Sequence, residues 1–134
     1  MHIKAYQQLI AWQKAIALVT CIYSVTSKFP RDEIYGLTSQ LRRAAVSVPS
    51  NITEGHGRLT DSQFRHFLGN ARGSLYEMQT QVELAMDLGY LDDKRASELL
   101  DQASEGGRLI NGLITSMGRS TKAMGTITDA DDPG

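Results

Sequence analysis

The chain has 134 residues and a mass of 14.8 kDa, which is the size of one domain with its own buried core. Its 14 basic and 15 acidic residues give a net charge of −1, which argues against a uniformly basic protein that coats nucleic acid but not against a local basic patch. The single cysteine, Cys21, excludes an intramolecular disulfide framework. With no targeting segment and no apolar run of about 20 residues, we expect a cytoplasmic protein that does not enter a membrane.

The first predicted helix covers residues 5–27 and carries two apolar stripes. Its larger apolar side chains recur at spacings of three and four residues, which predicts that they face a core. A second stripe widens the apolar surface to roughly 200° of the helix circumference, about twice what one bundle core needs. We therefore predict that the second stripe forms a subunit interface. The core stripe comprises Leu9, Trp12, Ile16, Val19 and Tyr23, and the interface stripe comprises Ala11, Ala15, Leu18, Ile22 and Val25.

The second predicted helix covers residues 32–54. Pro49 lies inside its apolar pattern and is expected to kink the helix near Ala45, because proline lacks a backbone donor. Gly55 and Gly57 follow, and a glycine in the left-handed conformation commonly ends a helix. We therefore expect the chain to turn at these glycines.

Polar residues at this helix end allow more than one interpretation. Asn51 falls on the inward edge of the helix and must find hydrogen bonds, and Glu54 can pair with Arg58 four residues later. We interpret these three residues first as a polar clasp that holds the turn, and a binding role comes second. The Gly-His-Gly-Arg segment at residues 55–58 also resembles a phosphate cradle, but a helix–helix turn is the simpler explanation.

The third predicted helix begins at Thr60, which forms a capping-box pattern with Gln63, and it ends at residues 88–90. The fourth begins near Asp92, and its paired glycines, Gly106 and Gly107, predict a bend or a close helix contact. No alternating strand pattern competes with these helices. The sequence therefore predicts an all-α fold, an antiparallel up-down-up-down four-helix bundle over residues 1–119, followed by a flexible tail over residues 120–134.

The sequence lacks the patterns that enzymes and metalloproteins need. The three histidines, His2, His56 and His66, do not share a ligand spacing, and no Cys-x-x-Cys or His-Glu-x-x-His segment occurs. No serine lies in a Gly-x-Ser-x-Gly segment. We therefore predict no catalytic residue, no metal site and no cofactor.

Basic residues are concentrated in the first part of the chain. Residues 1–60 carry a net charge of +4 and residues 61–134 a net charge of −5. If the second and third helices form a hairpin centred near Gly57, Arg43 is level with Ala71 and five arginines share one side of the hairpin. Arginine suits planar contacts with phosphate, but solvated or salt-bridged arginines, some across a subunit interface, are the alternative. The candidate nucleic-acid-binding residues are Arg42, Arg43, Arg58, Arg65 and Arg72.

Several motifs together resemble the family of 23S rRNA-intervening-sequence proteins. The most specific are Asn-Ile-x-Glu-Gly-x-Gly-Arg at residues 51–58 and Gly-Ser-Leu-x-Glu at residues 73–77, with Gln-Leu-Arg-Arg-Ala at residues 40–44 before them. The resemblance extends over roughly residues 6–118. Its motif residues are Asn51, Glu54, Gly55, Gly57, Gly73, Ser74 and Glu77.

The resemblance implies a left-handed four-helix bundle that assembles as a homopentameric ring with a central channel. Accessory proteins of diversity-generating retroelements look similar in fold and bind nucleic acid and a reverse transcriptase. On this basis we expect a non-enzymatic homo-oligomer, a homopentamer, that binds structured RNA or DNA through the arginine patch. The alternative is a homo-oligomeric scaffold that binds an unidentified protein partner and no nucleic acid.

Overall fold

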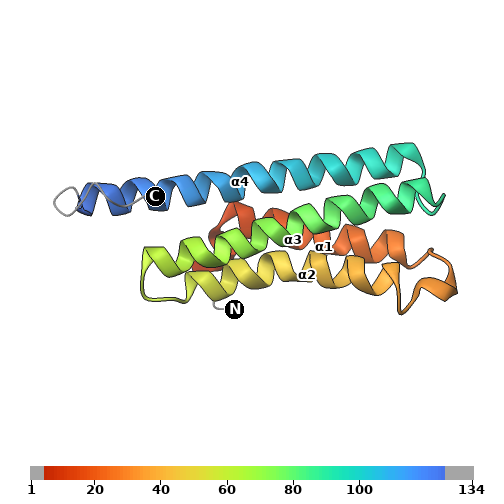
Figure 1. Ribbon diagram of the computed structural model, residues 1–134, viewed down its shortest axis with the longest axis horizontal. Coiled ribbons are helices and arrows are strands. Elements are labelled where there is room, and N and C mark those ends of the chain that lie inside the picture. The colour runs from red at the N-terminus through yellow and green to blue at the C-terminus, as the bar shows by residue number, and fades with distance from the viewer. Residues whose placement is uncertain (1–4, 126–134) are drawn as a thin grey trace.

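The computed structural model describes residues 5–125, which form four long helices joined by short connections (Figure 1). No strand occurs within these residues, which confirms the all-α prediction. The last helix continues to Gly125, past the point at which a tail was predicted to begin, and residues 126–134 lie outside the described part. The elements are η1 (Ala5–Gln8), α1 (Ile10–Thr26), η2 (Arg31–Glu33), α2 (Leu37–His56), α3 (Asp61–Asp87) and α4 (Asp93–Gly125).

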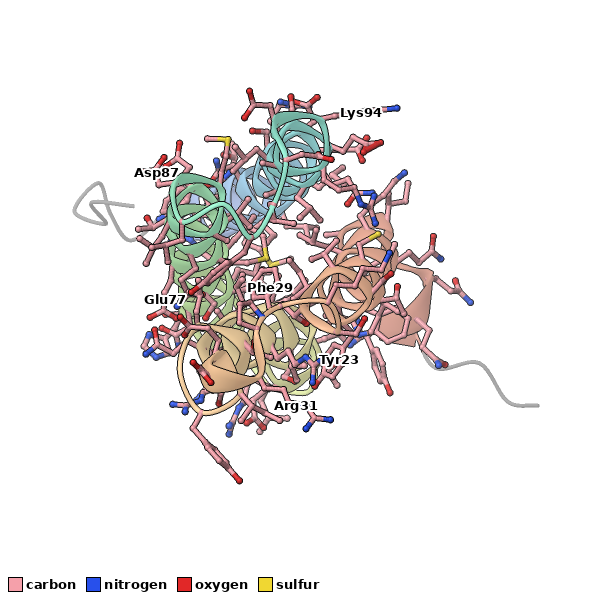
Figure 2. The ribbon with its side chains drawn as sticks, turned by 90° about the vertical axis from the view of Figure 1, so that its right-hand side faces the viewer. Tyr23, Phe29, Arg31, Glu77, Asp87 and Lys94 are labelled. Atoms are coloured by element: carbon pink, nitrogen blue, oxygen red, sulfur yellow. The ribbon has the colours of Figure 1, made fainter. Side chains whose placement is uncertain are left out.

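The four helices pack around one apolar core, which Figure 2 shows from one end of the bundle. Helix α1 contacts α2 and α4, and α3 contacts the same two helices. The diagonal pairs, α1 with α3 and α2 with α4, do not approach each other closely. The bundle therefore has an α1–α2 side and, opposite to it, an α3–α4 side. The largest fully buried side chains are Ile22, Leu41, Ile52, Leu68, Leu75, Met78, Val82, Leu99 and Ile110.

The sequence-based prediction for the two apolar stripes of α1 was wrong in part. The predicted core stripe lies at the edge of the bundle, where Leu9, Trp12 and Val19 are partly buried against the core. Ile16 is 39% exposed and Tyr23, which points away from the core in Figure 2, is 44% exposed. The proposed interface stripe instead lies inside the bundle, with every member at most 6% exposed. Periodicity shows which residues share a face but not which face turns inward. The residues that the correction moves into the core are Ala11, Ala15, Leu18, Ile22 and Val25.

Helix α2 begins five residues later than predicted, because Glu33 closes a turn ahead of it. The Glu33 Oε1 atom accepts a hydrogen bond from the Leu37 backbone N–H at 2.9 Å, and its Oε2 atom accepts one from the Tyr90 hydroxyl at 2.8 Å. These two bonds lower the pKa of the Glu33 carboxyl, and the Glu33 carboxylate raises the pKa of Tyr90. One carboxylate thus caps α2 and ties it to the α3–α4 connection.

The glycines act differently from the prediction. Gly57 ends α2 with φ −82°, in the right-handed region, and the left-handed glycine is Gly89, with φ 82° after α3. Gly55 lies inside α2, where an added Cβ would be 2.7 Å from Phe67 Cβ. Its role is therefore to let α2 and α3 approach each other closely.

The starts of the last two helices agree with the sequence. The Thr60 Oγ1 atom accepts a hydrogen bond from the Gln63 backbone N–H at 3.1 Å, which confirms Thr60 as the N-cap of α3. At Gly106 and Gly107, α4 continues without interruption, and an added Cβ there would lie 3.7 and 3.6 Å from Leu75 Cδ2. The two glycines are buried against α3, but an added Cβ would make only an ordinary van der Waals contact there, unlike at Gly55.

Candidate functional site

Arg42 belongs to the contact between α1 and α2. Its Nε donates to Thr26 Oγ1 at 2.8 Å, and its guanidinium carbon lies 4.5 Å from the centre of the Tyr23 ring. The hydrogen bond and the cation–π contact hold the side chain against α1. Arg42 therefore stabilises the α1–α2 side of the bundle.

Two other candidate arginines lie on the opposite side, between α3 and α4. Arg72 Nη1 donates to Asn111 Oδ1 at 2.8 Å. Arg65 lies beside α4, where a Cβ added to Gly118 would be 3.7 Å from its Cζ atom. Both side chains therefore face away from Arg42.

The remaining two arginines lie along the outside of α2 and its turn. Arg58 Nη2 is 3.5 Å from Glu54 Oε2, as the four-residue spacing predicts, and its guanidinium carbon lies 4.7 Å from the centre of the Phe67 ring. Arg43 is exposed, and no ion pair to it occurs among the described residues. Of the five arginines, Arg43 has the greatest freedom to meet a partner.

The predicted patch of five arginines on one side of a hairpin is therefore wrong, and the helix register explains why. Ser47 Oγ and Ser74 Oγ are 2.8 Å apart, so the hairpin is centred several residues after Gly57. Counting from this contact, Arg43 is level with Met78 and not with Ala71. In addition, consecutive residues of a helix point about 100° apart, which directs Arg42 toward α1 and Arg43 outward.

The family motifs meet between α2 and α3. The Asn51 side-chain amide donates to the Ser47 carbonyl oxygen at 2.8 Å and contacts Ser47 Oγ at 2.9 Å, and Ser47 in turn contacts Ser74. Gly73 and Glu77 border the same polar hollow. The clasp predicted from Asn51, Glu54 and Arg58 is therefore two separate units: a hydrogen-bonded chain across the hairpin and an ion pair at its end.

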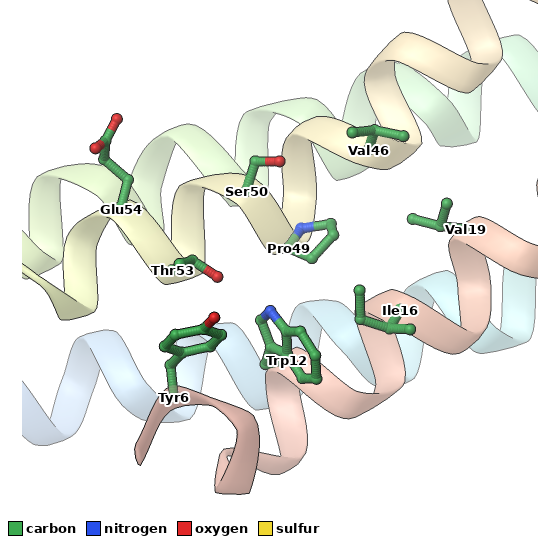
Figure 3. A pocket seen from close by; sticks show the side chains of 9 residues that line it. All are labelled: Tyr6, Trp12, Ile16, Val19, Val46, Pro49, Ser50, Thr53 and Glu54. Atoms are coloured by element: carbon green, nitrogen blue, oxygen red, sulfur yellow. The ribbon is translucent and has the colours of Figure 1, made fainter. Parts of the chain in front are cut away.

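An apolar groove lies between α1 and α2 on the outside of the bundle (Figure 3). Ile16 from α1 and Val46 from α2 are each 39% exposed along it. At one end, the Tyr6 and Trp12 rings meet edge to face with centroids 5.5 Å apart. We call this surface the α1–α2 groove; its apolar lining is Tyr6, Trp12, Ile16, Val19, Val46 and Pro49.

The groove continues toward the other end of the bundle. Val46 also borders a second hollow, which contains the exposed side chains of Tyr23 and Ile34. Arg42 and Arg43 border this second hollow. The extended α1–α2 groove therefore carries apolar side chains along its length. Its polar members are Ser50, Thr53 and Glu54 at the end near Tyr6 and Trp12, and Arg42 and Arg43 at the end near Tyr23. Sequence reasoning misplaced it because the side chains of α1 that line it were predicted to lie in the core.

Neither a metal centre nor a membrane span is found in the described part of the chain. No group of three or more His, Cys, Asp or Glu side chains there is arranged to hold a metal ion. Among the described helices, none is long and apolar enough to cross a membrane. His2, one of the histidines considered above, lies outside the described residues.

The chain was compared with known proteins. Residues 7–112 match the family model described as 23S rRNA-intervening sequence protein. The chain belongs to this family. A solved structure with the same fold is a protein of unknown function from the S23 ribosomal protein family of Bacteroides thetaiotaomicron, with a TM-score of 0.73 and 17% identity. The similarity covers 78% of this chain and 98% of the Bacteroides chain. No curated protein sequence matches the chain.

Proposed function

We propose that this chain is a non-enzymatic subunit that assembles with copies of itself through the α1–α2 groove, and that the homo-oligomer serves as a protein-interaction scaffold. The observation that carries the proposal is the run of exposed apolar side chains along the groove. Single exposed apolar residues are ordinary, but a continuous apolar surface is typical of interfaces. Trp and Tyr, which line this groove, are also enriched in interfaces.

In this proposal, the four helices alternate in direction in an antiparallel up-down-up-down bundle. Two contacts support it: Gly55 meets Phe67, and Ser47 meets Ser74. A residue later in α2 thus contacts a residue earlier in α3, as expected for antiparallel helices. Assembly into a ring of five, as the family resemblance implies, is part of the same proposal.

Sedimentation velocity combined with light scattering tests the self-assembly. We expect a particle whose mass is a multiple of 14.8 kDa at micromolar concentration. Ile16→Asp places a charge in the groove at an exposed position, so it should lower the particle mass while far-UV circular dichroism stays helical. A monomeric wild-type protein would overturn the proposal.

Binding of structured RNA or DNA is the second candidate function. It is favoured by two exposed arginines on α2 and its turn, Arg43 and Arg58, and by the charge of +4 in residues 1–60. An oligomer repeats these side chains, and repetition raises the avidity of a weak site. Contacts to phosphate release counterions, so binding through arginine must weaken steeply with salt.

Fluorescence anisotropy of a labelled RNA hairpin and a labelled DNA duplex at two salt concentrations tests this candidate. Salt-sensitive binding that Arg58→Glu reduces, with Arg108→Glu on α4 as the matched charge control, would support it. If folded protein leaves both labelled probes unbound at low salt, the candidate is wrong and the scaffold remains.

A further inference from the structure

Helix α3 carries a second exposed apolar stripe, away from the α1–α2 groove. Tyr76, Leu84 and Leu88 are 51%, 47% and 50% exposed. Tyr76 and Leu84 lie about 80° apart on the side of α3 that faces away from its buried residues, and Leu88 follows directly after the helix as its C-cap. We call these three residues the α3 stripe.

The groove and the stripe cannot meet within one molecule. The groove includes α1, and α1 lies diagonally across the bundle from α3. A contact between two different surfaces of identical chains is heterologous, and repeating it either closes a ring or extends a filament. The chain therefore presents the two unlike surfaces that such an assembly needs.

We infer that the α3 stripe of one copy fills the α1–α2 groove of the next copy. This inference rests on the self-assembly proposed above and assigns the second surface in the contact. The occupant of the groove is thus a second copy of this chain, seated through its α3.

The charges around the two surfaces are complementary. Arg42 and Arg43 border the groove, α1 contains no acidic residue, and the only one in α2, Glu54, is already paired with Arg58. Residues 73–93, which include the stripe, contain no Lys or Arg. Three acidic side chains accompany the stripe on α3: Glu77, Glu83 and Asp87.

Charge also distinguishes this arrangement from a symmetric one. If two grooves met face to face with their basic ends together, like charges would be brought together and would weaken association. When the stripe enters the groove, the arginines meet carboxylates. The charge pattern therefore favours the heterologous contact over a groove-to-groove pairing that joins the two basic ends.

The two surfaces also match in height along the bundle. Counting from the Ser47–Ser74 contact, Arg43 is level with Met78, next to Glu77. The hydrogen bond between Glu33 and Tyr90 places the neighbouring groove residue Ile34 near the level of Leu88. A ring around an axis parallel to the helices has no rise between copies, so facing groups must share a height.

The other end of the groove has a counterpart on α3 as well. Pro49 and Trp12 line the groove together, and Pro49 is level with Arg72 by the same count. At this height, α3 has Gly69 and Gly73, and an added Cβ at either would meet nothing within 4 Å. Each glycine costs a helix about 1 kcal/mol relative to alanine, although no contact within the chain requires it. In a neighbouring copy, they leave room for the indole ring of Trp12.

A mixing experiment with two exposed-site variants tests the inference. Ile16→Asp disables the groove and leaves the stripe intact, and Leu84→Asp does the reverse. Each variant alone should be folded and monomeric. Mixed in equal amounts, they should form a dimer with one copy of each, because one intact stripe meets one intact groove. Native mass spectrometry with one variant isotope-labelled identifies that dimer.

The outcomes separate the inference from the proposal that it rests on. A monomeric wild-type protein contradicts both. An assembled wild type with an equally assembled Leu84→Asp variant overturns the α3 assignment alone. Two monomeric variants that stay monomeric when mixed also overturn the α3 assignment.

Charge reversal provides a second and independent test. Arg43→Glu and Glu77→Arg should each weaken association about tenfold or more, and the double variant should recover most of that loss. Arg108→Glu, an exposed reversal on α4, is the control and should leave association unchanged. A double variant that associates no better than the weaker single variant would contradict the pairing.

Discussion

The two apolar stripes of α1 lie side by side on one helix but have different environments. The inward stripe includes Ala11 and Ala15, and the outward one carries the larger Trp12, Ile16 and Tyr23. Small side chains let a helix approach its neighbours, whose own large side chains then fill the core. The difference shows that the bulkiest apolar face of a helix is not always its buried face. On α1, this bulk lies at the edge of the bundle, where Trp12 is partly buried against the core and Ile16 is exposed along the α1–α2 groove.

The largest expected effect is the difference in unfolding free energy between a substitution in the inward stripe and one in the outward stripe. Leu18 is 3% exposed, so Leu18→Asp would place an unpaired carboxylate in the core and should remove about 4 kcal/mol or more of unfolding free energy. Ile16→Asp should change the unfolding free energy of a single chain by only about 0.5 kcal/mol, as exposed substitutions commonly do. Urea denaturation followed by circular dichroism measures both. Equal losses would mean that both stripes are buried in the single chain.

Two glycines extend the comparison to the α2–α3 contact. Gly55→Ala would bring a Cβ to 2.7 Å from Phe67 Cβ and should cost about 1–3 kcal/mol. Gly73→Ala meets nothing within the chain and should stabilise α3 by up to about 1 kcal/mol. Both are measured by urea denaturation of dilute, monomeric protein, since assembly makes stability depend on concentration. A stabilising Gly55→Ala would contradict the close helix approach there.

Arginine substitutions compare the two sides of the bundle. Arg42→Ala removes both a hydrogen bond and a cation–π contact and should cost about 1–2 kcal/mol. Arg72→Ala removes the hydrogen bond to Asn111 and should cost about 1 kcal/mol. Arg43→Ala, on the exposed surface, should lie within about 0.5 kcal/mol of the wild type. If Arg43→Ala were the most damaging in dilute, monomeric protein, the assignment of Arg42 and Arg72 as structural residues would fail.

The smallest effect should come from the connection between Glu33 and Tyr90. Because folding lowers the pKa of the Glu33 carboxyl, its ionised form stabilises the folded state above the pKa of the unfolded chain. That contribution should disappear as the pH falls through the lower folded-state pKa. Unfolding free energies of wild type and Glu33→Gln should therefore differ at neutral pH and converge in acid. A difference that stays constant down to about pH 3 would contradict this role.

The candidate site could be predicted only in part from the sequence. The Glu54–Arg58 pair and the Thr60 cap follow from residues within one helical turn of each other, and the structure contains both. The clustering of Asn51 with Ser74 is implied by the family motifs but is formed by a contact between two helices. The α1–α2 groove was missed, because two neighbouring apolar stripes give the same helical period.

The sequence by itself determined the family, the all-α class, the number of long helices and the start of α3, because these depend on local spacing, capping and motif identity. Only the tertiary structure decided which face of α1 is buried, where α2 begins and how the arginines separate. The Glu33–Tyr90 bond joins residues 57 apart, and Arg72 meets Asn111 across 39 positions. Such contacts depend on the volumes and register of helices distant in sequence, which no pattern within one helix contains.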